Sequence, residues 1–122
     1  QLTWVYPLKS FAQHGIPMAL SSDSPLTPCD PFRGIHTAVT RKVADGRTLS
    51  QNEGLSTLEA LKMYTYWGAY SSLEEQNKGS IAPGMLADLA VLNGDPTRMN
   101  PEQLGAVKVM ATVIDGKVVW ES

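Results

Sequence analysis

A short apolar run that ends in serines around one aspartate constrains the fold of this chain most. Residues 16–20 read Ile-Pro-Met-Ala-Leu, and Ser-Ser-Asp-Ser-Pro follows. Because the run is too short for a helix and lies between Gly15 and Pro25, it predicts a buried strand over residues 17–21. An acid at the end of a buried strand is costly unless it is paired, hydrogen-bonded or bound to a metal. Since the carboxyl ends of strands carry the chemistry in α/β sheets and barrels, Asp23 is the first candidate catalytic residue.

The same stretch also has a purely structural interpretation. Asp and Ser side chains often hydrogen-bond to the backbone two residues on and so form turns. Asp23 would then only shape the loop that leads to Pro25. The local residues leave both interpretations open.

Composition narrows the class of protein. The chain has 122 residues, enough for one domain of ordinary size, and it is 43% hydrophobic and 18% charged, as globular proteins are. A net charge of −2 without a basic face argues against a nucleic-acid partner. No apolar run approaches the ~20 residues of a membrane helix, and the first residues lack the pattern of a signal peptide. We therefore expect a cytoplasmic protein without a membrane partner.

Three side chains with reactive or metal-binding chemistry have simpler structural interpretations. Cys29 is the one cysteine of the sequence, so an internal disulfide is excluded, which fits a reducing compartment. We expect a structural role for this cysteine and not a nucleophilic one. His14 falls in the last turn of a helix predicted from Pro7, where a cation complements the helix dipole. His36 is by default a satisfied or exposed histidine, with a substrate contact as the alternative.

Two more helices are predicted downstream. Asp30 is a good N-cap and Pro31 a good first residue for a helix that runs to about residue 42 and buries Phe32, Ile35 and Val39. Ser56 and Glu59 form a capping box at the start of the next helix. Its predicted apolar face consists of Leu58, Leu61, Tyr64, Thr65 and Ala69.

The last third of the chain reads as antiparallel strands. Residues 87–92 and 107–114 predict two strands, and a type I′ turn at Asp115-Gly116 leads into a third over residues 117–121. The change in character places a boundary near Lys78, with residues 1–77 and 78–122 on its two sides.

Four stretches, in order, resemble one known family. They are Gly-Ile-Pro-Met-Ala-Leu-Ser-Ser-Asp-Ser-Pro at 15–25, Asp-Pro-Phe-Arg-Gly-Ile-His-Thr-Ala-Val-Thr-Arg at 30–41, Ser-Thr-Leu-Glu-Ala-Leu at 56–61 with Tyr-Thr at 64–65, and Lys-Gly-Ser-Ile-Ala-Pro-Gly-Met-Leu-Ala-Asp-Leu at 78–89. Together they resemble the C-terminal part of the amidohydrolase superfamily, in particular the YtcJ-like branch called amidohydrolase family 3. The resemblance covers nearly the whole chain.

The resemblance implies an α/β fold: the C-terminal portion of a metal-dependent hydrolase (β/α)8 barrel, plus strands of its composite β-sandwich domain. Residues 1–77 would supply the last barrel strand and helices, and residues 78–122 the sandwich strands. A barrel takes ~250 residues, so the chain is expected to be a C-terminal fragment. The family's metal ligands, a His-x-His pair, a carboxylated Lys or a Glu, and two later histidines, would lie upstream of Gln1.

The implied activity is hydrolysis of a C–N bond, in a small-molecule amide or cyclic amide, by a metal-activated water. Only Asp23 carries over from the family's catalytic site, as metal ligand and proton shuttle. The cofactor of the parent enzyme would be a divalent metal, zinc, with none bound by the fragment alone, which we expect to be inactive. His36 and Arg41 are candidate substrate contacts.

A second hypothesis comes from another class of function. The chain could be a non-catalytic folding or assembly module, since one plausible ligand falls short of the three or four that a zinc site needs. A cut barrel and a half sandwich would leave strand edges that template pairing, which predicts a homo-oligomer. A third possibility, an unrelated small α/β binding domain, would make the four ordered motifs a coincidence.

Overall fold

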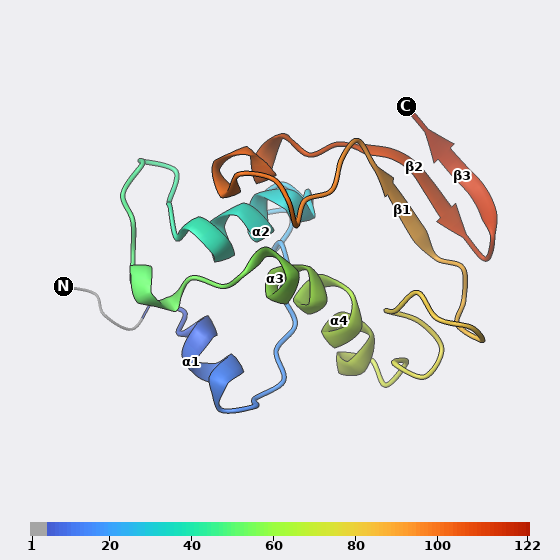
Figure 1. Cartoon of the computed structure of the whole chain (residues 1–122), viewed down its shortest axis with the longest axis horizontal. Helices are drawn as coiled ribbons and strands as arrows, with labels where there is room; N and C mark the ends of the chain where they lie inside the picture. The colour runs from blue at the N-terminus through green and yellow to red at the C-terminus, as the bar shows by residue number, and fades with distance from the viewer. Residues whose placement is uncertain (1–4) are drawn as a thin grey trace.

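The computed structural model describes residues 5–122, which form a group of short helices with a small sheet at one end (Figure 1). The helices and the sheet are separate parts of the molecule in this view, and the C-terminus ends the last strand. In chain order the elements are α1 (Leu8–Gln13), α2 (Pro31–Thr40), η1 (Gln51–Glu53), α3 (Thr57–Tyr64), α4 (Tyr66–Ser71), β1 (Leu89–Leu92), η2 (Pro101–Ala106), β2 (Val109–Ile114) and β3 (Lys117–Glu121), where η marks a 3-10 helix.

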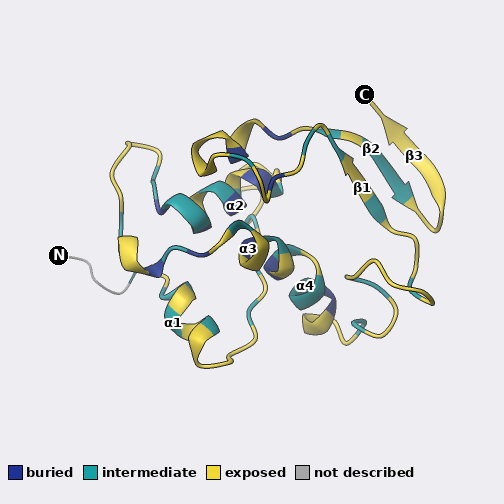
Figure 2. Cartoon of the chain, in the orientation of Figure 1, coloured by how far each residue is buried: buried dark blue, intermediate teal, exposed yellow. Residues whose placement is uncertain are grey.

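The hydrophobic core lies where α2, α3 and η2 meet (Figure 2). Leu104 of η2 is fully buried there, so a segment that follows β1 packs back onto the helices. Both sides of the predicted boundary near residue 78 therefore contribute to one core, and the division into 1–77 and 78–122 stays a prediction. The buried cluster consists of Phe32, Ile35, Ala38, Leu55, Ala60, Met63, Leu104 and Val107.

The segment before Asp23 is extended but is not the buried strand that we predicted. Only Met18 and Leu20 are partly buried, and the other residues from 16 to 21 are exposed. The Leu20 amide donates a hydrogen bond to Met63 O at 3.1 Å, at the end of α3. Within residues 5–122 no strand lies beside this segment, and a strand is defined by the ladder that it shares with a neighbour. The expectation of a buried strand over residues 17–21 is therefore wrong for this chain.

Helix α2 begins where the sequence predicts. The Asp30 carboxylate accepts a hydrogen bond from Phe32 N at 2.9 Å, and Pro31 occupies the first turn. The helix ends at Thr40, slightly earlier than expected, because Arg41 takes a left-handed conformation with φ of 60°. Its buried side chains are Phe32, Ile35 and Ala38, while Val39 is only partly buried against the core.

The predicted capping box is confirmed, but the helix after it differs from the prediction. Ser56 Oγ accepts from Glu59 N at 3.3 Å, and Glu59 Oε2 accepts from Ser56 N at 2.8 Å. The helix breaks at Thr65 (φ −115°, ψ −89°) into α3 and α4. In α3 the buried residues are Ala60 and Met63, whereas Leu58 and Thr65 are exposed. The predicted apolar face is wrong at these two positions, because the face of α3 that carries Ala60 and Met63 packs against the core.

The three strands form one antiparallel sheet in the order β1-β2-β3. Asp115 and Gly116 both have positive φ, 50° and 73°, as the predicted type I′ turn requires. Large apolar side chains on this sheet stay exposed, Trp120 of β3 and Val91 of β1 among them. No helix within the described residues is long and apolar enough to cross a membrane.

Candidate functional site

Asp23 lies in a loop that its neighbours hold in shape. The Asp23 amide donates to Ser21 Oγ at 3.4 Å, and Leu26 N donates to Asp23 O at 3.0 Å. The residue is exposed and has a φ of 56°, a conformation that Asp tolerates better than most side chains. Among residues 5–122 its carboxylate makes no hydrogen bond and no ion pair. The loop is thus built from serine and backbone contacts, and the carboxylate of Asp23 is left available to an external group.

An open cleft of about 830 Å³ lies beside this loop. Ser21 and Ser22, which precede Asp23, line one side, and the other sides come from α2, from the turn after α2 and from Tyr64 at the end of α3. Asp23 itself is not among the described residues that line the cleft. The cleft has the size of a site for a small molecule.

One face of α2 forms a wall of the cleft. Arg33 and Thr37 lie four residues apart, and Gly34 lies three residues before Thr37, so the three share one side of the helix. This side faces away from Phe32 and Ile35 in the core. A Cβ at Gly34 would overlap the Tyr64 hydroxyl, so the absence of a side chain at Gly34 is what lets the phenol approach α2.

The Tyr64 hydroxyl is a neutral donor at this wall. Burial raises the pKa of the Tyr64 phenol, and the negative charge of Asp30 raises it further. Within the described part of the chain the Tyr64 hydroxyl has no hydrogen-bond partner. The phenol therefore stays protonated at neutral pH and is free to donate into the cleft.

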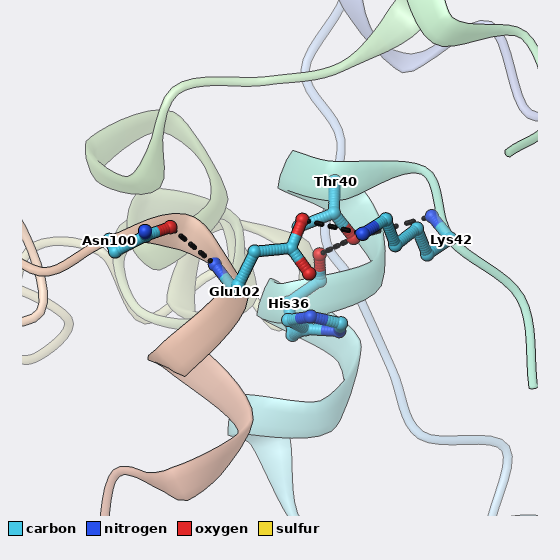
Figure 3. Close-up of polar contacts among 5 residues, drawn as sticks. All are labelled: His36, Thr40, Lys42, Asn100 and Glu102. Carbon is cyan, nitrogen blue, oxygen red and sulfur yellow. Dashed lines mark hydrogen bonds and ion pairs between the residues drawn. The ribbon is translucent and has the colours of Figure 1, made fainter. Parts of the chain in front are cut away.

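His36, one of the predicted substrate contacts, lies where α2 meets η2 (Figure 3). A Cβ at Gly105 of η2 would lie 4.0 Å from His36 Cγ, and His36 O accepts from Thr40 Oγ1 at 2.8 Å. Beside it, Lys42 Nζ forms an ion pair with Glu102 Oε1 at 2.7 Å. This Lys42 contact, followed by the charges of Lys42 and His36, lowers the pKa of Glu102. His36 thus borders the cleft from the α2–η2 contact and is not brought to Asp23.

Arg41, the second predicted substrate contact, is buried and engaged with the backbone. Its Nε donates to Leu49 O at 3.2 Å and its Nη2 donates to Val5 O at 2.5 Å. Burial lowers the pKa of the Arg41 guanidinium, and the nearby charge of Glu53 opposes that shift. Arg41 borders the cleft, but these contacts hold the turn after α2 in place.

The described residues do not form a metal centre of their own. Within residues 5–122 no three His, Cys, Asp or Glu side chains gather in a way that could hold a metal ion. His14 Nδ1 lies 2.7 Å from Ser10 O, and Cys29 is an exposed free thiol. Asp23 is thus a single carboxylate, which is fewer ligands than a zinc site needs.

Sequence reasoning missed Arg33, Thr37 and Tyr64 as residues of the cleft. The spacing of Arg33 and Thr37 along α2 was a signal that could have found them, since residues four apart share a helix face. Nothing in the sequence indicated that Tyr64 would meet Gly34, because that contact depends on how α2 and α3 cross.

Known proteins resemble this chain over most of its length. The Bacillus subtilis (strain 168) protein YtcJ, an amidohydrolase by its name, is 40% identical over 116 residues, which is 93% of this chain and 22% of YtcJ. The N-substituted formamide deformylase of Arthrobacter pascens is 33% identical over 96% of this chain and 22% of its own length. The imidazolonepropionase of Ruegeria sp. (strain TM1040) is 34% identical over 95% of this chain and 26% of its own length.

A solved structure agrees with these sequences. The crystal structure of an amidohydrolase from Thermotoga maritima MSB8 matches with a TM-score of 0.69 and 26% identity over 94% of this chain and 26% of that chain. This chain thus spans about a quarter of the length of each of these four proteins. A model of the Amidohydrolase family matches residues 1–120. The predicted resemblance is confirmed, and the chain belongs to the amidohydrolase family.

Proposed function

We propose that this chain is the C-terminal part of an enzyme that hydrolyses a C–N bond in a small-molecule amide or cyclic amide, with Asp23 as its proton acceptor. The observation that carries the proposal is the Asp23 carboxylate, which is exposed beside a cleft and unengaged by the described residues. The name of one relative supports the bond type, since a deformylase of N-substituted formamides acts on a C–N bond.

In this proposal Asp23 moves a proton twice. It takes a proton from the water that attacks the carbonyl carbon, and then gives it to the leaving nitrogen as the C–N bond breaks. An exposed carboxylate with no protein partner suits this role, because it can accept a proton without first breaking a hydrogen bond. The cleft lined by Ser21 and Ser22 would hold the substrate beside it.

The cofactor part of the proposal reaches beyond this chain. A divalent metal such as zinc lowers the pKa of a bound water, which is the chemistry that it supplies in hydrolases. The described residues offer Asp23 alone, so they do not fit a complete metal site, and the other ligands would have to come from elsewhere in a longer protein. The role of Asp23 as a metal ligand therefore stays a prediction.

The proposed parent has a (β/α)8 barrel and a composite β-sandwich. Residues 1–77 would contribute its last strand and helices, and residues 78–122 would contribute sandwich strands. The extended segment that ends at Leu20 has no strand beside it in the described residues, which leaves its edges available to barrel strands of a longer chain.

A second candidate function is a non-catalytic folding or assembly module that pairs with a second copy. The exposed apolar side chains of the sheet favour it, because patches of this kind mark interfaces. They are Val91, Met110, Ile114, Val118, Val119 and Trp120.

A substrate survey of the longer protein tests the proposal against this alternative. We expect release of amine or ammonia from some members of a panel of N-acyl compounds and cyclic amides, and loss of that release after chelation of divalent metals. If protein that carries bound metal hydrolyses no compound of the panel, the result would favour the assembly module.

A further inference from the structure

Several side chains that can donate hydrogen bonds line the cleft. Arg33 is exposed and makes no ion pair within the described residues, so its guanidinium is available. Thr37 lies one helical turn further along the same wall of α2, and its hydroxyl also has no partner there. Tyr64 adds a neutral phenol from α3.

Two serines of the extended segment before Asp23 also line the cleft and add further donors. Ser21 Oγ accepts a hydrogen bond from Asp23 N at 3.4 Å, and Ser22 Oγ accepts one from Ser24 N at 3.3 Å. In both contacts the hydroxyl oxygen is the acceptor, so the O–H proton of each serine is left to donate.

The one acidic side chain among the described lining residues is partly engaged: one carboxylate oxygen caps α2, while the negative charge remains. Asp30 Oδ1 accepts from Phe32 N at 2.9 Å as the N-cap of α2. The neighbouring cations are engaged too, since Lys42 pairs with Glu102 and Arg41 donates to backbone carbonyls. Among these cations Arg33 is thus the exposed one that makes no ion pair within the described residues, and a carboxylate is a group that its guanidinium can bind through two hydrogen bonds.

The rest of the lining is apolar. Leu8, Leu20, Ala38 and Val43 contribute carbon surface, and the Tyr64 phenol occupies the space that a side chain at Gly34 would take. A ligand that matches this lining has an apolar body and one acceptor-rich anionic end.

We infer that the cleft binds the carboxylate of a small molecule, with Arg33 as its charged partner and Thr37, Tyr64 and the serine hydroxyls as neutral donors. This deepens the proposed function, on which it rests for identifying the ligand as the substrate: the scissile amide would then belong to a molecule that also carries a carboxylate. Asp23, one residue beyond Ser22, would lie next to the bound molecule.

Binding to the ¹⁵N-labelled 122-residue chain tests the inference without turnover. The probes are acetate, benzoate and N-acetylphenylalanine, each titrated against its uncharged amide, with inorganic phosphate as a second anion. We expect the carboxylates to shift the amide signals of residues 21–22 and 33–37 and to bind at least tenfold more tightly than the amides. Arg33→Gln should weaken carboxylate binding by tenfold or more, and Tyr64→Phe should weaken it several-fold.

Two matched variants control for the loss of a positive charge and for the loss of a phenol hydroxyl. Arg98→Gln removes an exposed guanidinium on the turn after β1, and Tyr70→Phe removes a phenol hydroxyl outside the cleft lining, so both should leave the affinity unchanged. The inference would be overturned by equal affinity for carboxylates and their amides, or by signal shifts confined to other residues. It would also be overturned by an Arg33→Gln variant that binds carboxylates as the parent does, or by binding of phosphate without binding of carboxylates. A failed hydrolysis assay would leave this measurement standing, since no bond is broken in it.

Discussion

Glu53 and Ser10, far apart in the sequence, are joined by two hydrogen bonds at the start of α1. Ser10 N donates to Glu53 Oε2 at 2.9 Å, and Ser10 Oγ donates to Glu53 Oε1 at 2.6 Å. Pro7, which precedes α1, has no side chain that can cap the helix. The Glu53 carboxylate takes that place from η1, where its charge also suits the positive end of the helix dipole.

The contact between Glu53 and Ser10 predicts a pH-dependent loss of stability. The hydrogen bonds from Ser10 lower the pKa of Glu53 below its ordinary value. A lowered folded-state pKa means that this stabilisation is present above about pH 4.3 and is lost as the pH falls through the lowered value. We expect Glu53→Gln to lower the midpoint of urea unfolding at pH 7, and the difference from the parent chain to shrink toward pH 3. Glu121→Gln, on exposed β3, is the control, and an equal effect of both variants would contradict the assignment.

Substitution of two helical glycines should have opposite effects. Alanine normally stabilises a helix by up to about 1 kcal/mol relative to glycine. At Gly34 the new Cβ would overlap the Tyr64 hydroxyl, so we expect Gly34→Ala to destabilise the chain and Tyr64→Phe to restore part of the loss. At Gly68 the nearest atom is 4.0 Å away, so Gly68→Ala should stabilise. Thermal unfolding measures both, and stabilisation by Gly34→Ala would show that Tyr64 moves freely.

The packing of η2 on α2 depends on Leu104. Because Leu104 is fully buried among residues of α2 and α3, Leu104→Ala should cost about 2–5 kcal/mol of unfolding free energy. Ile81→Ala, at a side chain that is 91% exposed, should change the free energy little. Urea unfolding of both variants gives the comparison, and equal small effects would mean that η2 is not part of the folding unit.

The ion pair between Lys42 and Glu102 ties the same two elements at the surface. Both side chains are about half exposed, so its contribution should be small and sensitive to salt. We expect Glu102→Gln to lower the melting temperature slightly at low ionic strength and not at 1 M NaCl. Lys108→Gln, at an exposed position without an ion pair in the described residues, is the control. A loss that is independent of salt would assign the effect to packing.

Local signals predicted much of this structure. The caps at Asp30 and Ser56 and the turn at Asp115 lie as expected, because each depends on residues within a few positions of one another. The strand over residues 17–21 failed because a strand also needs a partner, and the described chain places none beside it.

The residues of the cleft likewise differ in whether neighbouring residues in the sequence predict them. Asp23 could be proposed from the apolar run before it and from a family resemblance. Arg33 and Thr37 follow from helix spacing once α2 is known, but the approach of Tyr64 to Gly34 depends on how two helices pack. The capping of α1 by Glu53 is likewise a contact between distant segments, which no local pattern encodes.

The role of Asp23 is the central claim, and one substitution tests it most directly. Turnover of an amide substrate should be measured for Asp23→Asn in the longer protein, with bound metal matched to the parent. Asp115→Asn is the control, because both aspartates are exposed with φ near 50°, which Asn also tolerates. The account predicts a ~10²–10⁴-fold fall in kcat for Asp23→Asn and none for Asp115→Asn. Near-normal turnover by Asp23→Asn would contradict it and leave Asp23 as a residue of the turn.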